Sequence, residues 1–93
     1  MVPKGRTPNR IKKYRCICGY TQDEVAEILG IAGANLVSQW ERGKVAPSID
    51  NLLKLCVLFH TLIEELYCER MKDHRITICT ALVQHEKRKS RKM

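Results

Sequence analysis

Residues 21–43, TQDEVAEILGIAGANLVSQWERG, decide how this chain folds. Thr21 and Glu24 have the spacing of a capping box, which predicts that a helix begins at Thr21. Apolar residues follow at helical spacing, and Gly30 is expected to end the helix because glycine adopts the left-handed conformation most easily. A second short helix, ended by Gly43, is predicted from the apolar positions Leu36, Val37 and Trp40.

The two predicted helices and the glycine-containing turn between them form a helix-turn-helix, whose second helix fits the major groove of DNA. Ala26 lies four residues before Gly30, and its small side chain lets the two helices cross closely. Trp40 could stack on a nucleic-acid base, but its spacing from Leu36 and Val37 favours a place in the core. The sequence therefore predicts a DNA-reading helix that apolar side chains brace from behind.

The charges of the chain are concentrated at its two ends. The net charge is +7, from 17 basic and 10 acidic residues. Residues 1–7 carry two basic side chains, residues 8–67 carry seven of each sign, and residues 68–93 carry eight basic and three acidic side chains. Basic ends on a neutral core suit a polyanion such as nucleic acid, although a solvated tail kept for solubility explains the same pattern.

The composition excludes several other classes of protein. The 93 residues suffice for one domain, and no apolar run approaches the roughly 18 residues needed to span a bilayer. The N-terminal residues lack the apolar middle of a secretory signal, so we expect a cytoplasmic, nucleoid-associated protein. The five cysteines include no CxxC pair and no histidines at zinc-finger spacing, which predicts no metal site and no cofactor.

Nothing in the sequence indicates an enzyme. His60, His74 and His85 are scattered, and no Ser/His/Asp or paired-carboxylate arrangement stands at a turn that would expose it. The sequence GIAG at residues 30–33 lacks the Lys-Ser/Thr that follows the glycines of a phosphate-binding loop.

Three further helices complete the prediction of an all-α domain. Thr7 and Pro8 suit the N-cap and first position of a helix that Gly19 ends, with a buried stripe of Ile11, Tyr14 and Ile17 or Cys18. Ser48 suits the N-cap of a central core helix, whose apolar residues are Ile49, Leu52, Leu53, Leu55, Cys56 and Phe59. Thr61 and Glu64 repeat the capping-box spacing and predict a short last helix with Leu62, Ile63, Leu66 and Tyr67.

Residues 68–93 leave more than one structure open. Residues 68–75 are polar and could extend the last helix. Residues 76–83, ITICTALV, are too few for periodicity to distinguish a strand from a buried helix, and we expect them to form a dimerisation or partner surface. The charge run at residues 86–93 is typical of a disordered tail.

Residues 8–67 resemble the phage-repressor and Cro-type helix-turn-helix family. The matching residues are Arg10-Ile11, Tyr14-Arg15, residues 19–27, 29–31 and 37–43, Pro47-Ser48 and residues 52–55. The resemblance implies an all-α, five-helix, lambda-repressor-like DNA-binding bundle at residues 8–67. Residues 1–7 are then a basic N-terminal arm, and residues 68–93 are a C-terminal extension with a basic tail.

One spacing departs from the family pattern. Gly30 and Trp40 are ten residues apart where the family usually has nine, so we expect a turn lengthened near Ala32 and Gly33. A longer turn alters the angle at which the second helix starts.

The resemblance and the outward face of the second helix together indicate the DNA-contacting residues. We expect base contacts from Ala34, Asn35, Ser38 and Gln39, because asparagine and glutamine amides pair with adenine. Phosphate contacts, which position a protein without reading sequence, are expected from Gln22, Arg42, Lys44, Arg10 and Lys13, with Lys12 as a further candidate. Arg15 and Glu41 match family positions that form an ion pair. The pair joins the first helix of the bundle to the second helix of the helix-turn-helix, and the resemblance implies the same pair here.

Three functions stay open at this stage. The first is a sequence-specific transcriptional regulator that binds double-stranded DNA as a homodimer on a pseudo-palindromic operator. The second is an antitoxin-like autoregulator of the same fold that binds a partner protein through residues 76–83. The third is an interaction module whose second helix never touches DNA.

Overall fold

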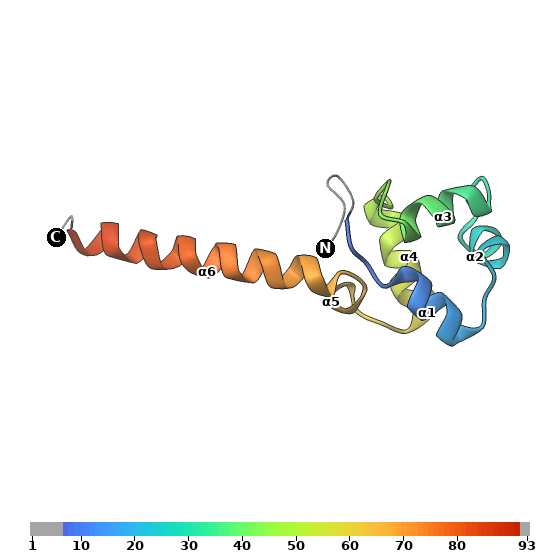
Figure 1. The fold of residues 1–93 in the computed structure, drawn as a ribbon, viewed down its shortest axis with the longest axis horizontal. Coiled ribbons are helices and arrows are strands. Elements are labelled where there is room, and N and C mark those ends of the chain that lie inside the picture. The colour runs from blue at the N-terminus through green and yellow to red at the C-terminus, as the bar shows by residue number, and fades with distance from the viewer. Residues whose placement is uncertain (1–6, 92–93) are drawn as a thin grey trace.

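The computed structural model describes residues 7–91, which form six α-helices and no strands. The helices are α1 (Ile11–Cys18), α2 (Gln22–Leu29), α3 (Ala34–Glu41), α4 (Ile49–Phe59), α5 (Ile63–Leu66) and α6 (Cys68–Arg91). Figure 1 shows α1 to α5 gathered into a bundle from which α6 projects, and the molecule measures 59 × 27 × 22 Å. The prediction of an all-α bundle is confirmed, and α6 adds a sixth helix to it.

The α2 helix begins where the capping box predicts. Thr21 Oγ1 accepts a hydrogen bond from Glu24 N at 3.1 Å, and Glu24 Oε1 accepts one from Thr21 N at 2.9 Å. Gly30 ends the helix in the left-handed conformation, with φ +73°. The turn then runs over residues 30–33 before α3 begins at Ala34.

The start of α1 differs from the prediction. The helix begins at Ile11 rather than at Pro8, and Ile11 N donates to the Asn9 side-chain oxygen at 3.1 Å. Thr7 N donates to Gly43 O, 3.1 Å away. Because the backbone of Thr7 is bonded to the loop after α3, Thr7 and Pro8 lie outside the helix, and their assignment to its first turn is wrong.

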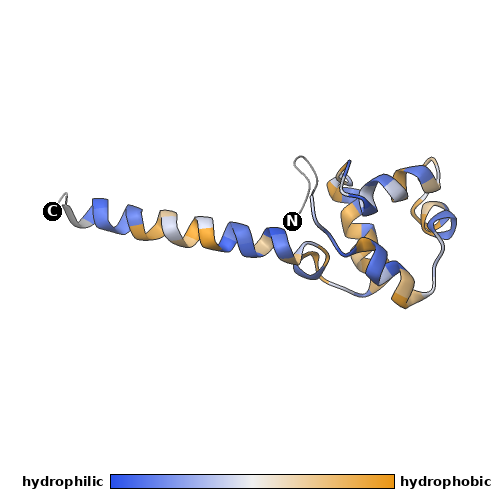
Figure 2. Cartoon of the chain, viewed as in Figure 1, coloured by the Kyte–Doolittle hydropathy of each residue, from blue (hydrophilic) through white to orange (hydrophobic). Residues whose placement is uncertain are grey.

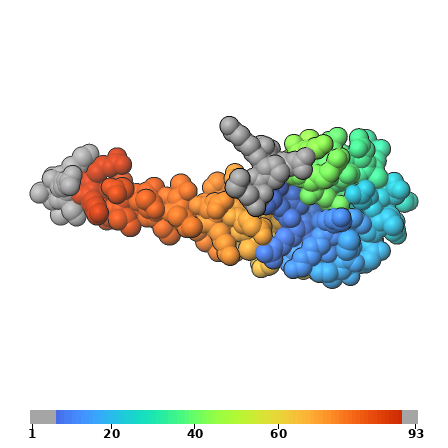
Figure 3. All heavy atoms as spheres, viewed as in Figure 1, coloured from blue at the N-terminus to red at the C-terminus, as the bar shows by residue number. Residues whose placement is uncertain are grey.

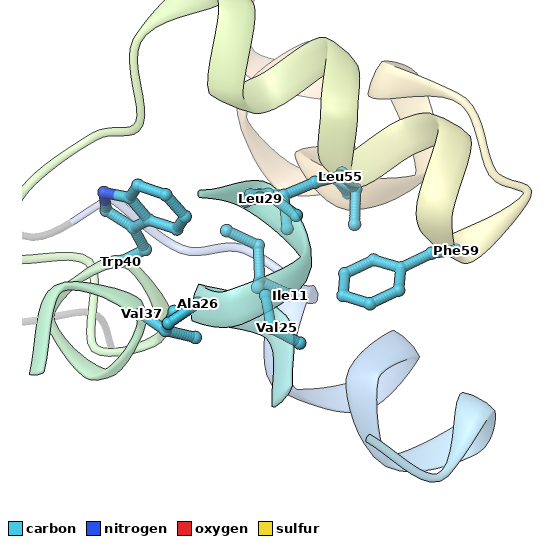
Figure 4. Packing of buried hydrophobic residues seen from close by; sticks show 9 residues of the cluster. Ile11, Val25, Ala26, Leu29, Val37, Trp40, Leu55 and Phe59 are labelled. Atoms are coloured by element: carbon cyan, nitrogen blue, oxygen red, sulfur yellow. The ribbon is translucent and has the colours of Figure 1, made fainter. Parts of the chain in front are cut away.

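The core of the described residues is built from all five helices of the bundle. Its buried side chains are Ile11, Val25, Ala26, Leu29, Val37, Trp40, Leu55, Phe59 and Leu66. Figure 4 shows the side chains from α1 to α4 converging on one another. Trp40 is only 1% exposed, so its interpretation as a core residue is confirmed.

Several apolar residues that were expected to be buried lie on the surface. Ile17 and Ile49 are at least two-thirds exposed, and Leu53 is half exposed. Ile17 stands in the last turn of α1, beyond the part of the helix that Ile11 anchors in the core. Ile49 and Leu53 point away from the side of α4 that carries Leu55, because a small bundle covers only one side of each helix.

The second predicted capping box does not form. Leu62 rather than Thr61 is the N-cap of α5, and no side chain caps that helix. Glu64 instead pairs with Arg75 of α6, with 3.1 Å between Oε2 and Nη2. The α5 helix is therefore a single turn that leads directly into α6.

Residues 68–91 form one continuous helix, α6. The apolar run at residues 76–83 is helical, and the charge run continues the helix as far as Arg91, so the expectation of a disordered tail is wrong up to that residue. The remaining two residues, and residues 1–6 of the basic arm, lie outside the described part of the chain. Within that part, none of the helices combines the length and the apolar character needed to cross a membrane.

The middle of α6 is apolar and uncovered. Ile76, Ile78, Leu82 and Val83 are each more than half exposed. Figure 2 shows this apolar segment between two hydrophilic ends of the helix, and Figure 3 shows that α6 stands clear of the bundle over most of its length. The dimerisation or partner surface expected at residues 76–83 is therefore exposed on this helix.

Candidate nucleic-acid interface

The α3 helix presents a polar side outward because its apolar side is fixed to the core. Val37 and Trp40 are buried, and Figure 4 shows Val37 lying against Ala26 of α2. The opposite side carries Asn35, Ser38 and Gln39, at spacings of three and four residues. Asn35 is exposed, whereas Ser38, Gln39 and the neighbouring Ala34 are half-buried. The structure therefore brings the four candidate base-contacting residues together on one helix.

Two hollows border this helix. One, of about 260 Å³, is lined by residues of the turn and of α3, namely Ala32, Gly33, Asn35, Leu36 and Gln39. The other, of about 530 Å³, is lined by Lys12, Arg15, residues 19–23 and Ala34. The second hollow thus lies between the first turns of α2 and α3. Gln22 and Lys12, two of the residues expected at phosphates, line this second hollow.

An ion pair joins α1 to the end of α3. Arg15 Nε lies 2.5 Å from Glu41 Oε2, and Arg15 Nη2 lies 3.3 Å from Oε1. The two side chains are only 13% and 4% exposed, so little water screens them. The hydrogen bond to Glu41 raises the pKa of the Arg15 guanidinium above its ordinary value. The structure places in contact the two residues that the family resemblance pairs.

Gln22 belongs to the same network. Its Nε2 donates to Glu41 Oε1 at 3.0 Å, while Arg15 Nη1 donates to Tyr20 O at 2.9 Å. The sequence indicates Gln22 as a phosphate contact but gives no sign of its bond to Glu41. An amide has two N–H donors and one acceptor oxygen, so this bond uses only part of the hydrogen-bonding capacity of Gln22.

Asn9, which sequence reasoning missed, fixes the end of α3 to the start of α1. Its Nδ2 donates to Trp40 O at 2.8 Å and to Thr7 O at 3.2 Å. Its Oδ1 accepts from Ile11 N. An asparagine two residues before a helix is the sole hint in the sequence, because such side chains often bond to nearby backbone.

The basic residues expected at phosphates have different surroundings. Arg42 and Lys44 are exposed just past the end of α3, and Lys13 is exposed on α1. Arg10 differs from them, because its Nη2 lies 3.2 Å from Glu69 Oε1 at the start of α6. That hydrogen bond to Glu69 raises the pKa of Arg10. The guanidinium of Arg10 is thus already engaged by a carboxylate.

Comparison with known proteins identifies the family to which the bundle belongs. Residues 11–66, which span α1 to α5, match the family described as Helix-turn-helix. Over 57 residues the chain is 44% identical to the HTH-type transcriptional regulator ImmR of Bacillus subtilis (strain 168). That alignment covers 61% of this chain and 44% of ImmR, so this chain matches less than half of ImmR.

Two further relatives align over 59 residues at 30% identity. They are the uncharacterized HTH-type transcriptional regulators MJ0272 of Methanocaldococcus jannaschii and YgzD of Bacillus subtilis (strain 168). Each alignment covers 63% of this chain and 88% of the relative. The family match takes in more than half of the sequence and every helix of the bundle. The chain therefore belongs to the Cro/C1-type helix-turn-helix family.

Proposed function

We propose that this protein is a sequence-specific transcriptional regulator that inserts α3 into the major groove of double-stranded DNA as a homodimer on a pseudo-palindromic operator. Membership of the helix-turn-helix family and similarity to proteins named as transcriptional regulators indicate a DNA-binding regulator rather than an enzyme. In this proposal residues 8–67 bind DNA, residues 68–93 mediate assembly, and the protein works in the cytoplasm at the nucleoid.

The polar side of α3 is the observation that carries the proposal. Asn35 and Gln39 are four residues apart and so lie on the same face of the helix. Each amide can pair with N6 and N7 of an adenine, which is worth about 1–3 kcal/mol of discrimination against another base. Ser38 adds a hydroxyl between them, and the Ala34 methyl group suits a thymine methyl. The buried ion pair and Trp40 keep this face at a fixed angle to the bundle.

Phosphate contacts position the helix in this proposal. Gln22, Arg42 and Lys44 flank α3, and Lys13 extends the basic surface along α1. Arg10 joins them only by exchanging Glu69 for a phosphate, because the two side chains are paired. Each phosphate that the protein neutralises steepens the dependence of log K on log[salt] by about 0.9.

The exposed apolar side of α6 supports the homodimer. A dimer doubles the set of base contacts and places two copies of α3 in half-sites that are separated by about one helical turn of DNA, or by a multiple of it. An operator with two related half-sites follows from the two-fold symmetry of the protein.

Selection of bound sites from random duplex DNA tests both parts of the proposal. The wild type should select two related half-sites at a fixed spacing. Gln39→Ala should lose the preference at the base that it contacts, and Ile78→Asp should select single half-sites because the apolar side of α6 is broken. Glu27→Ala, an exposed polar position of α2 away from the proposed contacts, should select the same sites as the wild type.

Unchanged selection by both test variants would contradict the proposal. Unchanged selection by Gln39→Ala and by Asn35→Ala would instead indicate an interaction module whose α3 does not read bases.

An antitoxin-like autoregulator is the second candidate, and the uncovered apolar side of α6 is the observation that favours it. In that case α3 still binds an operator, but residues 76–83 bind a different protein. The purified chain would then be monomeric or aggregated until it is co-expressed with that partner. A stable homodimer of the purified chain would exclude this alternative.

A further inference from the structure

We propose that α6 of one copy docks its apolar side into a groove between α2 and α4 of a second copy, and that the second copy returns the same contact. The inference rests on the homodimer of the proposed function and names the two surfaces that form it. It predicts an exchange of α6 helices rather than a pair of α6 helices packed on each other.

The groove is formed by two helices of the bundle. Its lining residues are Ile28 and Leu29 of α2 and Leu53, Lys54, Val57 and Leu58 of α4, and its volume is about 460 Å³. Val57 is 75% exposed, and Ile28 and Leu53 are about half exposed. All six residues belong to α2 or α4, so a helix seated in the groove leaves the polar side of α3 open.

The apolar side of α6 has the spacing of a helix that binds in a groove. Ile76, Cys79 and Val83 follow one another at i, i+3 and i+7, and Ile78 and Leu82 lie beside them at i and i+4. Together they form an apolar side that extends over residues 76–83, about 11 Å along the helix. The exposed stripe of α4 from Ile49 through Leu53 to Val57 has about the same length, 12 Å.

Charges around the two surfaces are complementary. Exposed carboxylates stand one turn before the apolar residues of the groove, with Glu24 four residues before Ile28 and Asp50 three residues before Leu53. The basic lining residue, Lys54, donates to the backbone oxygen of Leu29. The flanks of the apolar side of α6 are basic on balance: Lys72 and Arg75, the latter paired with Glu64, stand with Asp73 before it, and Lys87, Arg88 and Lys89 stand with Glu86 after it. Opposite charges around matching apolar surfaces favour association and fix the register of docking.

A parallel pair of α6 helices explains neither the charges around the two surfaces nor the exposed groove. Side by side in parallel, two α6 helices set the basic residues 87–89 of one copy against those of the other. Such a pair also leaves the groove between α2 and α4 uncovered. Reciprocal docking covers the groove and the apolar side of α6 in both copies. The two contacts are related by two-fold symmetry, so the dimer is closed and leaves neither surface exposed to a third copy.

Analytical ultracentrifugation of the full chain over a range of concentrations tests the inference. Ile78→Asp breaks the α6 surface, and Val57→Asp breaks the groove at its most exposed wall. Each change should weaken dimerisation at least about 100-fold, because each dimer would bury two unpaired carboxylates. Leu62→Asp, at the exposed N-cap of α5 where aspartate is well tolerated, should dimerise like the wild type.

A mixture of the two test variants gives the sharper measurement. In the mixed dimer, the intact α6 of the Val57→Asp chain meets the intact groove of the Ile78→Asp chain. Both substitutions then lie in the second contact, between the altered α6 and the altered groove. Reciprocal docking therefore predicts that the mixture forms dimers at concentrations where each variant alone is monomeric. Circular dichroism melting of each variant checks that it folds, and Leu53→Asp replaces Val57→Asp if that variant does not.

Three results would overturn the inference. If Val57→Asp dimerises as tightly as the wild type, while Ile78→Asp does not, α6 pairs with α6. If the mixture forms no dimers, the two surfaces do not meet. A wild-type chain that stays monomeric removes the homodimer as well, whereas selection of single half-sites by that monomer would leave the DNA-reading part of the proposed function in place.

Discussion

Replacing Arg15 with methionine keeps most of the apolar stem of the side chain and removes the guanidinium from the Glu41 carboxylate. Arg15 donates two hydrogen bonds to that carboxylate, and the Glu41 side chain is 4% exposed, so water has little access to replace them. The variant leaves a buried negative charge beside the Gln22 amide, which is a weaker donor at 3.0 Å. We therefore expect a large loss of stability from one substitution.

The magnitude follows from the burial of the pair. Removal of one partner from a buried ion pair destabilises a protein by roughly 3–5 kcal/mol. The Gln22 bond puts this case at the lower end, at about 3 kcal/mol. Domains have a free energy of unfolding of about 0.05–0.15 kcal/mol per residue, so this loss is a large share of the total. At an m value of about 1.5 kcal/mol/M, the midpoint of urea unfolding falls by about 2 M.

Urea unfolding followed by the fluorescence of the single tryptophan, Trp40, measures this loss. The double variant Arg15→Met with Glu41→Leu is the informative companion. It leaves no charge buried, so its stability should lie within about 1 kcal/mol of the wild type. A loss below about 1 kcal/mol for Arg15→Met, or a double variant that loses the sum of the two single changes, would refute the reasoning.

Three further predictions follow from other contacts. Gly43→Ala should destabilise the domain by at least about 2 kcal/mol in urea unfolding, because φ is +72° and the new Cβ would lie 2.9 Å from Thr7 N. Gly19→Ala, with φ +81° and open space around it, should lose only about 1 kcal/mol. Equal losses for the two variants would disprove the role of Thr7. Cys56 should react more slowly with a thiol reagent at pH 8 than the exposed Cys16, Cys18 and Cys79, because burial raises the pKa of its thiol. Faster labelling of Cys56 than of the exposed cysteines would count against its packing. The pKa of Glu69 is lowered from its ordinary value of 4.5, first by a hydrogen bond from its own backbone N–H and then by Arg10. The stability that the ionised Glu69 carboxylate contributes is therefore present above pH 4.5 and is lost as the pH falls through the folded-state pKa. In an NMR titration, Arg10→Gln should raise this pKa only part of the way back, and an unchanged pKa would show that the pair does not persist in solution.

The helix-turn-helix itself can be predicted from the sequence because its signals are local. Thr21 and Glu24 are three residues apart, and the left-handed Gly30 needs no distant partner to end its helix. Trp40 can be placed in the core from its spacing to Val37 alone. The outward side of α3 follows from the same periodicity, which is why its candidate base contacts can be named before the structure is known.

Features that depend on distant contacts escape the same reasoning. The Asn9 amide bonds to the carbonyl of Trp40, 31 residues along the chain, and nothing near Asn9 in the sequence specifies that partner. The same applies to Thr7, which the local pattern places in a helix but which bonds to Gly43 instead. Periodicity also shows which side of α4 is apolar without showing whether another helix covers it, so the exposure of Leu53 could not be foreseen.

The conformation of α6 was open because eight apolar residues suit a strand or a helix equally well. The flanking residues hold the information that decides between them. Residues 68–75 and 84–91 are rich in glutamate, lysine, arginine and other good helix formers, and they contain no glycine or proline. A helix that forms on both sides of the apolar run is propagated through it more easily than it is interrupted, because nucleation is the costly step.

The positions of the two apolar surfaces separate the proposed base-reading helix, α3, from the proposed dimer contacts. Neither the groove between α2 and α4 nor the apolar side of α6 includes a residue of α3. Breaking the dimer should therefore leave the base preference within each half-site unchanged and weaken binding to the whole operator. The reason is that the second α3 of a dimer binds at a high effective concentration once the first is bound, and a monomer loses this gain entirely. Val57→Asp should thus bind an isolated half-site like the wild type and bind the paired site at least about tenfold more weakly. A changed base preference in that variant would mean that the groove and α3 are coupled through the bundle, and the separation of the two roles would then fail.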